Sequence, residues 1–172
     1  MVEIRIPFAS RFRTDVPAPD AAAAIGAGLI AGTIALTLME AFAVLVYDEP
    51  AWKLVRMMAA IVRGPAALAP QDEGDAAIAA IGFGTHYALS LLYALALAGV
   101  MRGVPRDLGP IVGFCCGVAL YFANLHGFTR IFPWFVEMRT VDTLVAHAVF
   151  GMMAGGTYCQ LACRAKEDDV AG

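Results

Sequence analysis

Charged residues are scarce in this chain of 172 residues: Asp, Glu, Lys and Arg make up 16%, whereas hydrophobic residues make up 60%. A soluble domain is typically about 25% charged and about 45–50% apolar. The composition therefore disfavours a single core with a water-exposed surface, and the mean hydropathy of +0.69 agrees with this. The net charge of −3 includes no basic block, so we expect no nucleic-acid partner.

Several catalytic motifs are also missing from the sequence. It contains no glycine-rich phosphate loop after a strand, no HExxH motif and no serine in a plausible triad order. These absences disfavour hydrolases and nucleotide-dependent enzymes. No convincing internal repeat and no pair of Gly/Pro-broken apolar segments is present either, which differs from a conventional secondary transporter. We therefore do not expect the isolated chain to be an enzyme.

Four long stretches of the chain contain no Lys, Arg or Asp, and Glu40 is the one acidic residue that interrupts them. A helix needs about 20 residues to cross a bilayer, and each stretch is near or above this length. The sequence therefore predicts an all-α membrane protein, one four-helix bundle whose first partner is the lipid bilayer. The predicted spans are residues 21–47, 76–101, 108–129 and 143–163.

The distribution of Lys and Arg predicts the orientation of the bundle. More of them lie on the side of the N-terminal segment 1–20 and the C-terminal tail 164–172 than on the opposite side. Because positive residues accumulate in the cytoplasm, both ends are expected to be cytoplasmic. The first apolar run is too long for a cleaved signal peptide and is expected to stay in the membrane. Asp20 is well placed to cap the first helix.

The connections and glycines carry further patterns. Between the first two spans, residues 50–75 predict a short amphipathic helix that lies in the membrane interface and ends at Gly64-Pro65. In residues 130–140, the run Phe132-Pro133-Trp134-Phe135 suits an aromatic anchor at the headgroup level. Glycines at a spacing of four in the third and fourth spans predict close helix contacts. They are Gly109, Gly113, Gly117, Gly151 and Gly155.

Each predicted span holds one ionisable residue that suggests chemistry: Glu40, His86, His126 and His147. Such groups are costly to bury in a membrane and indicate a functional site. Counting along an antiparallel bundle allows all four to lie in one layer of the outer half of the membrane. The sequence therefore predicts that these four side chains form a polar cluster.

Helical phase adds neighbours to this cluster. Thr37 shares a stripe with Glu40, and Ser90 and Tyr93 share one with His86. On the third span Asn124 lies over the glycine ridge, whereas His126 points away from it. Further relay or second-layer candidates are Thr37, Ser90, Tyr93, Asn124, Arg130 and Arg139.

The chemistry of the predicted cluster suggests three functions. In a fourth interpretation the cluster has only a structural role. Imidazole and carboxylate ligands suit a transition metal ion, which would make the chain a small redox or metal-handling subunit. A histidine pair suits axial ligation of haem b, with Arg130 and Arg139 near its propionates. Glu and His also form proton relays in membranes. Alternatively the polar groups hold helices together in a structural or assembly subunit.

The four cysteines fall in the cytoplasmic halves of the third and fourth spans. That compartment is reducing, so a disulfide is not expected. Their spacing matches no zinc or iron–sulfur pattern, and packing is favoured over a thiol cluster. They are Cys115, Cys116, Cys159 and Cys163.

The second half of the chain resembles the YagU-like small proteins of the bacterial inner membrane. The resemblance covers roughly residues 82–160 and is carried by the histidines, the Pro-Trp-Phe connection and the neighbouring glycines. It implies a multi-pass inner-membrane protein of a poorly characterised group for which a role in acid tolerance is suggested. That role agrees with the proton-conducting alternative. Apart from the resemblance, the expected protein partners are further copies in a homo-oligomer or the subunits of a larger membrane complex. The motifs that carry it are Thr85-His86, Gly117, Asn124-Leu125-His126, Pro133-Trp134-Phe135, Ala146-His147 and Phe150-Gly151.

Overall fold

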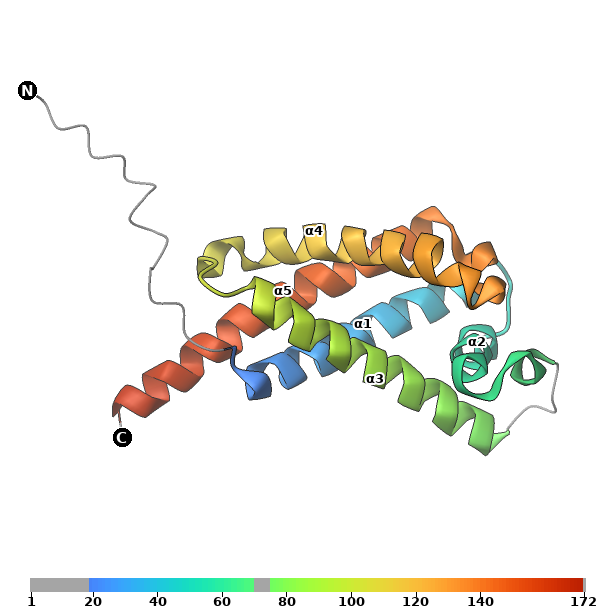
Figure 1. Ribbon diagram of the computed structural model, residues 1–172, viewed down its shortest axis with the longest axis horizontal. Coiled ribbons are helices and arrows are strands. Elements are labelled where there is room, and N and C mark those ends of the chain that lie inside the picture. The colour runs from blue at the N-terminus through green and yellow to red at the C-terminus, as the bar shows by residue number, and fades with distance from the viewer. Residues whose placement is uncertain (1–18, 70–74, 172) are drawn as a thin grey trace, which may run out of the picture.

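A computed structural model describes residues 19–69 and 75–171, and side chains as far as residue 163. Within these ranges the chain is helical and forms no strand, which confirms the predicted all-α class (Figure 1). Predictions for segment 1–18 and for side chains of the tail lie outside the described residues. The elements are α1 (Ala21–Val46), α2 (Trp52–Arg63), η2 (Pro65–Leu68), α3 (Ala76–Val100), η3 (Arg106–Leu108), α4 (Gly109–Phe122), η4 (Ala123–Gly127), η5 (Phe128–Arg130), η6 (Pro133–Met138) and α5 (Val141–Ala171).

The helix ends follow from local chemistry. The Asp20 side chain accepts a hydrogen bond from the backbone nitrogen of Ala23 at 2.9 Å, which confirms the predicted cap of α1. Asp75 caps α3 in the same way, accepting from the backbone nitrogens of Ala77 and Ile78. Helix α2 ends at Gly64, whose positive φ of 79° suits a residue without a Cβ. The predicted end of the amphipathic helix at Gly64 is thus confirmed.

Three helical stretches are long and apolar enough to cross a membrane: Ala21–Val46, Ala76–Val100 and Arg106–Arg130. The first two match the predicted spans to within one residue. The fourth predicted span lies in α5, which extends from Val141 to Ala171, further at both ends than predicted. These lengths support the prediction of a membrane protein.

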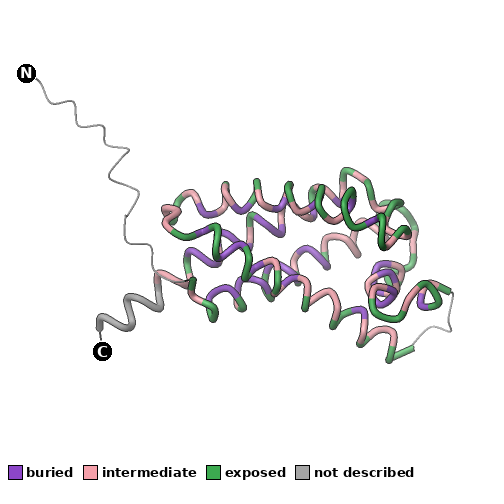
Figure 2. The backbone as a smooth tube through the Cα atoms, in the orientation of Figure 1, coloured by how far each residue is buried: buried purple, intermediate pink, exposed green. Residues whose placement is uncertain are grey.

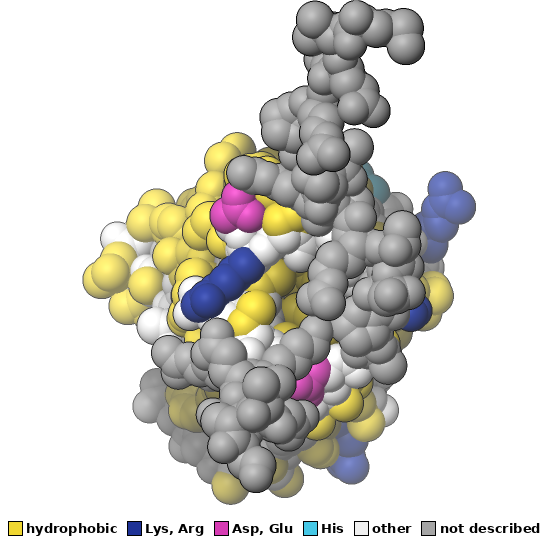
Figure 3. All heavy atoms as spheres, turned by 90° about the vertical axis from the view of Figure 1, so that its left-hand side faces the viewer, with side chains coloured by type: hydrophobic (Ala, Val, Ile, Leu, Met, Phe, Trp, Pro, Cys, Tyr) yellow, Lys and Arg dark blue, Asp and Glu magenta, His cyan; other side chains and the backbone are white. Residues whose placement is uncertain are grey.

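The long helices α1, α3, α4 and α5 run alternately in opposite directions, and α2 lies across one end of them (Figure 1). Helix α5 packs along both α1 and α4, and α3 packs against α1 and α2. Buried residues follow the faces where the helices meet, whereas the outward faces are exposed (Figure 2). Seen from the end where α1 begins, hydrophobic side chains make up much of the described surface and few described charges are visible (Figure 3). Along the helices, large apolar side chains such as Leu45, Leu92 and Ile111 are exposed, which suits contact with lipid.

Glycine allows these helices to approach closely, as the sequence predicts. A Cβ on Gly117 would overlap the backbone carbonyl of His147, so α4 and α5 meet backbone to backbone. In the interface between α1 and α3, a Cβ on Gly32 would lie 2.6 Å from the Ser90 hydroxyl oxygen. Between α2 and α3, a Cβ on Gly82 would overlap the carbonyl of Val55. Close contact therefore joins three pairs of helices.

The end of the third predicted span differs from a regular α-helix. Helix α4 ends at Phe122 and continues as a π-helical turn, η4, and then as the 3₁₀ turn η5. The π turn spans Ala123–Gly127 and so contains both Asn124 and His126. Turns of this kind interrupt α-helices, frequently at functional sites. Asn124 and His126 therefore lie where the helical repeat changes.

Candidate ligand cavity

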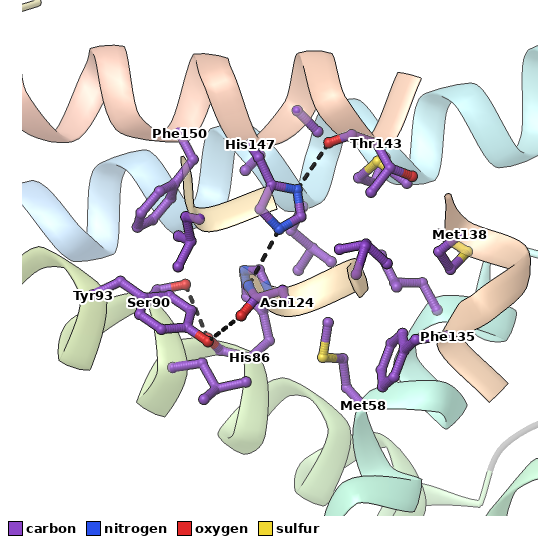
Figure 4. A pocket seen from close by; sticks show the side chains of 18 of the residues that line it. Met58, His86, Ser90, Tyr93, Asn124, Phe135, Met138, Thr143, His147 and Phe150 are labelled. Atoms are coloured by element: carbon purple, nitrogen blue, oxygen red, sulfur yellow. Dashed lines mark hydrogen bonds between the residues drawn. The ribbon is translucent and has the colours of Figure 1, made fainter. Parts of the chain in front are cut away.

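A cavity of about 300 Å³ lies between α1, α2, α3, the end of α4 and α5. Its volume falls at the lower end of the range of small-molecule sites, about 300–1,000 Å³. Most of its lining is apolar. The side chains of His86, Ser90, Tyr93, Asn124 and His147 lie together at its polar end, whereas Thr143 lies nearer Met138 (Figure 4). The polar lining residues are His86, Ser90, Tyr93, Asn124, Thr143 and His147.

A chain of hydrogen bonds across three helical segments forms the first part of the polar end. The Tyr93 hydroxyl donates to Oδ1 of Asn124 at 2.8 Å. The amide nitrogen of Asn124 lies 3.4 Å from Nε2 of His147, and Nδ1 of His147 lies 2.8 Å from the Thr143 carbonyl oxygen. Because a carbonyl oxygen only accepts, Nδ1 carries the proton of a neutral His147 and Nε2 accepts from Asn124. Each hydrogen bond of this chain, drawn as a dashed line in Figure 4, therefore has an assigned donor and acceptor.

His86 forms the second part of the polar end. Its Nε2 lies 3.0 Å from the carbonyl oxygen of Gly32 on α1, so this nitrogen donates and the neutral ring keeps Nδ1 unprotonated. The Ser90 hydroxyl donates to the backbone carbonyl of His86 at 2.9 Å. The close approach of α1 at Gly32 brings this carbonyl within reach of the imidazole. The two histidines thus face one cavity, held by two different helix backbones.

Aromatic and methionine side chains form the opposite, apolar end (Figure 4). Phe135 and Met138 on η6 line the cavity together with Met58 on α2. The indole nitrogen of Trp134 donates to the Met57 carbonyl at 3.2 Å and so fixes η6 against α2. The sequence predicts an aromatic anchor in this connection. In the structure, Phe132 and Phe135 of the same run line the cavity.

The structure brings together two of the four ionisable residues of the predicted cluster. His86 and His147 line the cavity, but Glu40 and His126 do not. His126 is exposed and lies against the rings of Tyr121 and Phe122, with centroids 5.7 and 5.5 Å away. The prediction that all four converge on one site is therefore corrected. His126 lies on the side of the third span that points away from the cavity, as its helical phase indicates, so Asn124 lines the cavity in its place. Among the described residues, no group of three or more His, Cys, Asp or Glu side chains could hold a metal ion.

Glu40 has an unusual environment outside the cavity. Both of its carboxylate oxygens are buried, and neither forms a hydrogen bond within the described part of the chain. A buried polar group without a partner is costly, and an ionised one more so. Glu40 is therefore a separate polar position on α1 rather than a member of the histidine site.

Of the predicted relay or second-layer residues, some line the cavity and others do not. Ser90, Tyr93 and Asn124 line the cavity as the helical phase predicts, whereas Thr37, Arg130 and Arg139 do not. Nε of Arg139 donates to the Leu125 carbonyl at 2.6 Å and Nη2 donates to the Thr129 hydroxyl at 2.6 Å. This guanidinium thus binds the irregular end of the third span, which sequence reasoning missed because it depends on the π turn.

The cysteines form no cluster in the described structure. Cys115 is exposed, whereas Cys159 is buried where a Cβ on Gly109 would lie 2.7 Å from its sulfur. Cys116 and Cys163 are each partly buried. Consecutive residues such as Cys115 and Cys116 point to different sides of a helix, which separates their thiols. The favoured packing role agrees with the position of Cys159.

Comparisons with known proteins give no match to a protein-family model, to a curated protein or to a solved structure. The resemblance to the YagU-like proteins therefore stays a prediction.

Proposed function

We propose that the chain is a four-span protein of a bacterial inner membrane, with α5 as the fourth span, α2 in the interface and both ends in the cytoplasm. The three apolar stretches and the alternating directions of the long helices support this topology. Helix α2 is short, lies across the bundle and carries Lys53, Arg56 and Arg63, which suits the membrane surface.

Within this topology, we propose that the protein binds a small, mainly apolar molecule with one polar end. The observation that carries the proposal is the cavity of about 300 Å³, with hydrogen-bonding groups at one end and phenylalanines and methionines at the other. Binding sites for small molecules have this character: a mostly apolar lining and a few placed polar groups. A two-histidine wall, with no third ligand in the described residues, gives a metal ion less support.

Filling the cavity tests this function. Ala146 is buried, 3% exposed, and lines the cavity, so Ala146→Phe should occupy part of the space. Ala119 is exposed on α4, and Ala119→Phe is the matched control for the added ring. In lipid nanodiscs, ¹⁹F NMR of a fluorinated alkylbenzene should detect saturable binding to the wild type and to Ala119→Phe, with at least tenfold weaker binding to Ala146→Phe. Equal binding by all three proteins would contradict the proposal.

A second candidate function, proton binding or conduction linked to acid tolerance, is favoured by Glu40. A carboxylic acid buried at membrane depth without a partner suits a group that takes up and releases a proton. In proteoliposomes with a pH-sensitive dye, Glu40→Gln should abolish any proton flux of the wild type. Glu49→Gln is the control, because Glu49 pairs with Lys53 at 3.1 Å at the end of the bundle. Flux that survives in Glu40→Gln would overturn this candidate.

A further inference from the structure

We propose that the ligand of the cavity is a neutral alcohol or phenol, which donates a hydrogen bond from its hydroxyl group to Nδ1 of His86. The inference deepens the proposed ligand-binding function and rests on it. It follows from which hydrogen-bonding positions at the polar end are already used and which remain open.

The donors of the polar end are nearly all used within the protein. The hydroxyl of Thr143, which also lines the cavity, pairs with the Thr140 hydroxyl at 2.9 Å. The Tyr93 hydroxyl donates to Asn124, and the Ser90 hydroxyl donates to the His86 carbonyl. In both neutral histidines the N–H donates to a backbone carbonyl, at Gly32 for His86 and at Thr143 for His147. Asn124 has two amide protons, of which one points to His147. The second amide proton of Asn124 therefore remains for a ligand.

The acceptors of the same residues are more abundant. Nδ1 of His86 forms no hydrogen bond within the described structure, and in the neutral ring it presents a lone pair. The hydroxyl oxygens of Tyr93 and Ser90 each use their proton and keep a lone pair for a further donor. A ligand that only accepts would leave these acceptors without partners, which is unfavourable in an apolar site. The inventory therefore favours a ligand that donates.

The described lining of the cavity, which has no charged side chain at its polar end and an apolar opposite end, limits which donating ligands fit. No carboxylate, Lys or Arg lies among the described residues that line the cavity. A protonated amine would thus be buried without a counter-charge, at high cost in a membrane. A hydroxyl group is neutral, donates to Nδ1 of His86 and can accept the free proton of Asn124. The apolar body of the molecule would extend toward Phe135 and Met138 at the other end of the cavity (Figure 4).

Two probes test the inference: one has a hydroxyl group that can donate a hydrogen bond, and in the other a methyl group replaces the hydroxyl hydrogen. We would compare a fluorinated 4-alkylphenol with its methyl ether, which has the same apolar body but only accepts. Both affinities are measured by ¹⁹F NMR in nanodiscs and referred to each probe's concentration in the lipid, taken from protein-free nanodiscs. The wild type should bind the phenol about tenfold more tightly, the factor given by about 1.4 kcal/mol for one hydrogen bond. ¹⁵N NMR should show Nδ1 of His86 shifting with the phenol and not with the ether.

Two variants test whether the preference for the phenol over its methyl ether depends on the imidazole of His86. His86→Phe keeps a ring of similar size and should bind both probes equally, whereas His126→Phe, outside the cavity, should keep the tenfold preference. If His86→Phe fails to fold, the wild-type affinity ratio and the ¹⁵N shift still decide the question. Equal wild-type affinities would overturn the donor assignment and leave the ligand-binding function standing. Saturable binding of neither probe would overturn both proposals.

Discussion

A Cβ atom on Gly113 of α4 would overlap the backbone carbonyl of Gly151 of α5, because the two helices touch through their backbones at this point. In a lipid environment helix association depends on such close packing rather than on the exclusion of water from apolar surfaces. The contact brings α4 and α5 together one turn away from Gly117 and His147. It therefore also fixes the distance across one wall of the cavity.

Gly113→Ala should destabilise the protein by about 1–3 kcal/mol, because the added methyl group forces the two backbones apart. Gly84→Ala on α3 is the matched control, since a Cβ there would meet no atom within 4 Å. The control should be neutral or more stable by up to about 1 kcal/mol, through helix propensity. Unfolding in mixed micelles measures both changes. Equal stability of the two variants would show that the α4–α5 contact does not depend on glycine.

Tyr93→Phe should lower stability by about 1–3 kcal/mol, because it leaves Oδ1 of the partly buried Asn124 without its donor. Tyr87→Phe removes the same hydroxyl from an exposed hydrogen bond to Thr33, at 3.0 Å, and should cost less than about 1 kcal/mol. Chemical unfolding of both variants gives the difference. A larger loss at Tyr87 than at Tyr93 would speak against the hydrogen-bonded chain.

Arg139→Ala should destabilise the end of the third span by about 1–2 kcal/mol, because its guanidinium donates to the carbonyl of Leu125 and to Thr129. Arg130→Ala is a suitable control, since Arg130 is exposed and no side-chain hydrogen bond of Arg130 is found in the described structure. Hydrogen exchange of residues 123–130 should become faster in the first variant alone. Unchanged exchange in Arg139→Ala would exclude this role.

Tyr47, just beyond α1, should show a dependence on alkaline pH. Its hydroxyl donates to the Asp142 carboxylate at 2.8 Å, and this bond raises the pKa of Tyr47 above its ordinary value of 10.0. A raised folded-state pKa means that the stabilising contribution is complete below pH 10.0 and is lost as pH rises through the higher value. The phenolate absorbance of the wild type minus that of Tyr47→Phe reports the titration. Asp142→Asn should move the midpoint down toward 10.0, and a wild-type midpoint at or below that value would refute the assignment.

Much of the fold could be predicted from where charges are missing. The runs without Lys, Arg or Asp mark α1 and α3 to within one residue at each end, because charged groups are costly in helices that face lipid. The Asp20 cap and the Gly64 end follow from equally local rules. The 3₁₀ helix η6 could not be predicted from local rules, because Trp134 holds it in place through a hydrogen bond to Met57, far away in the chain.

Less of the candidate site than of the fold could be predicted from the sequence. Helical phase identified Ser90 and Tyr93 as neighbours of His86, because these residues share one regular helix. Counting depth along each span placed Glu40 and His126 with them, but depth does not fix rotation about the helix axis. Helical phase already directed His126 away from the glycine ridge, as the structure has it. The position of Glu40 outside the site and the cavity itself depend on how closely the helices approach one another, which a sequence pattern does not contain.

The position of α5 has a consequence for biosynthesis. The cavity has walls from α1, near the beginning of the chain, and from α5, near its end, and α5 packs along both α1 and α4. While a ribosome is still making the chain, His86 and Asn124 already exist but His147 does not. The cavity is therefore completed last, and the ligand proposed for it can bind only once the final helix has docked. Occupancy of the cavity would report that assembly of the whole chain is complete.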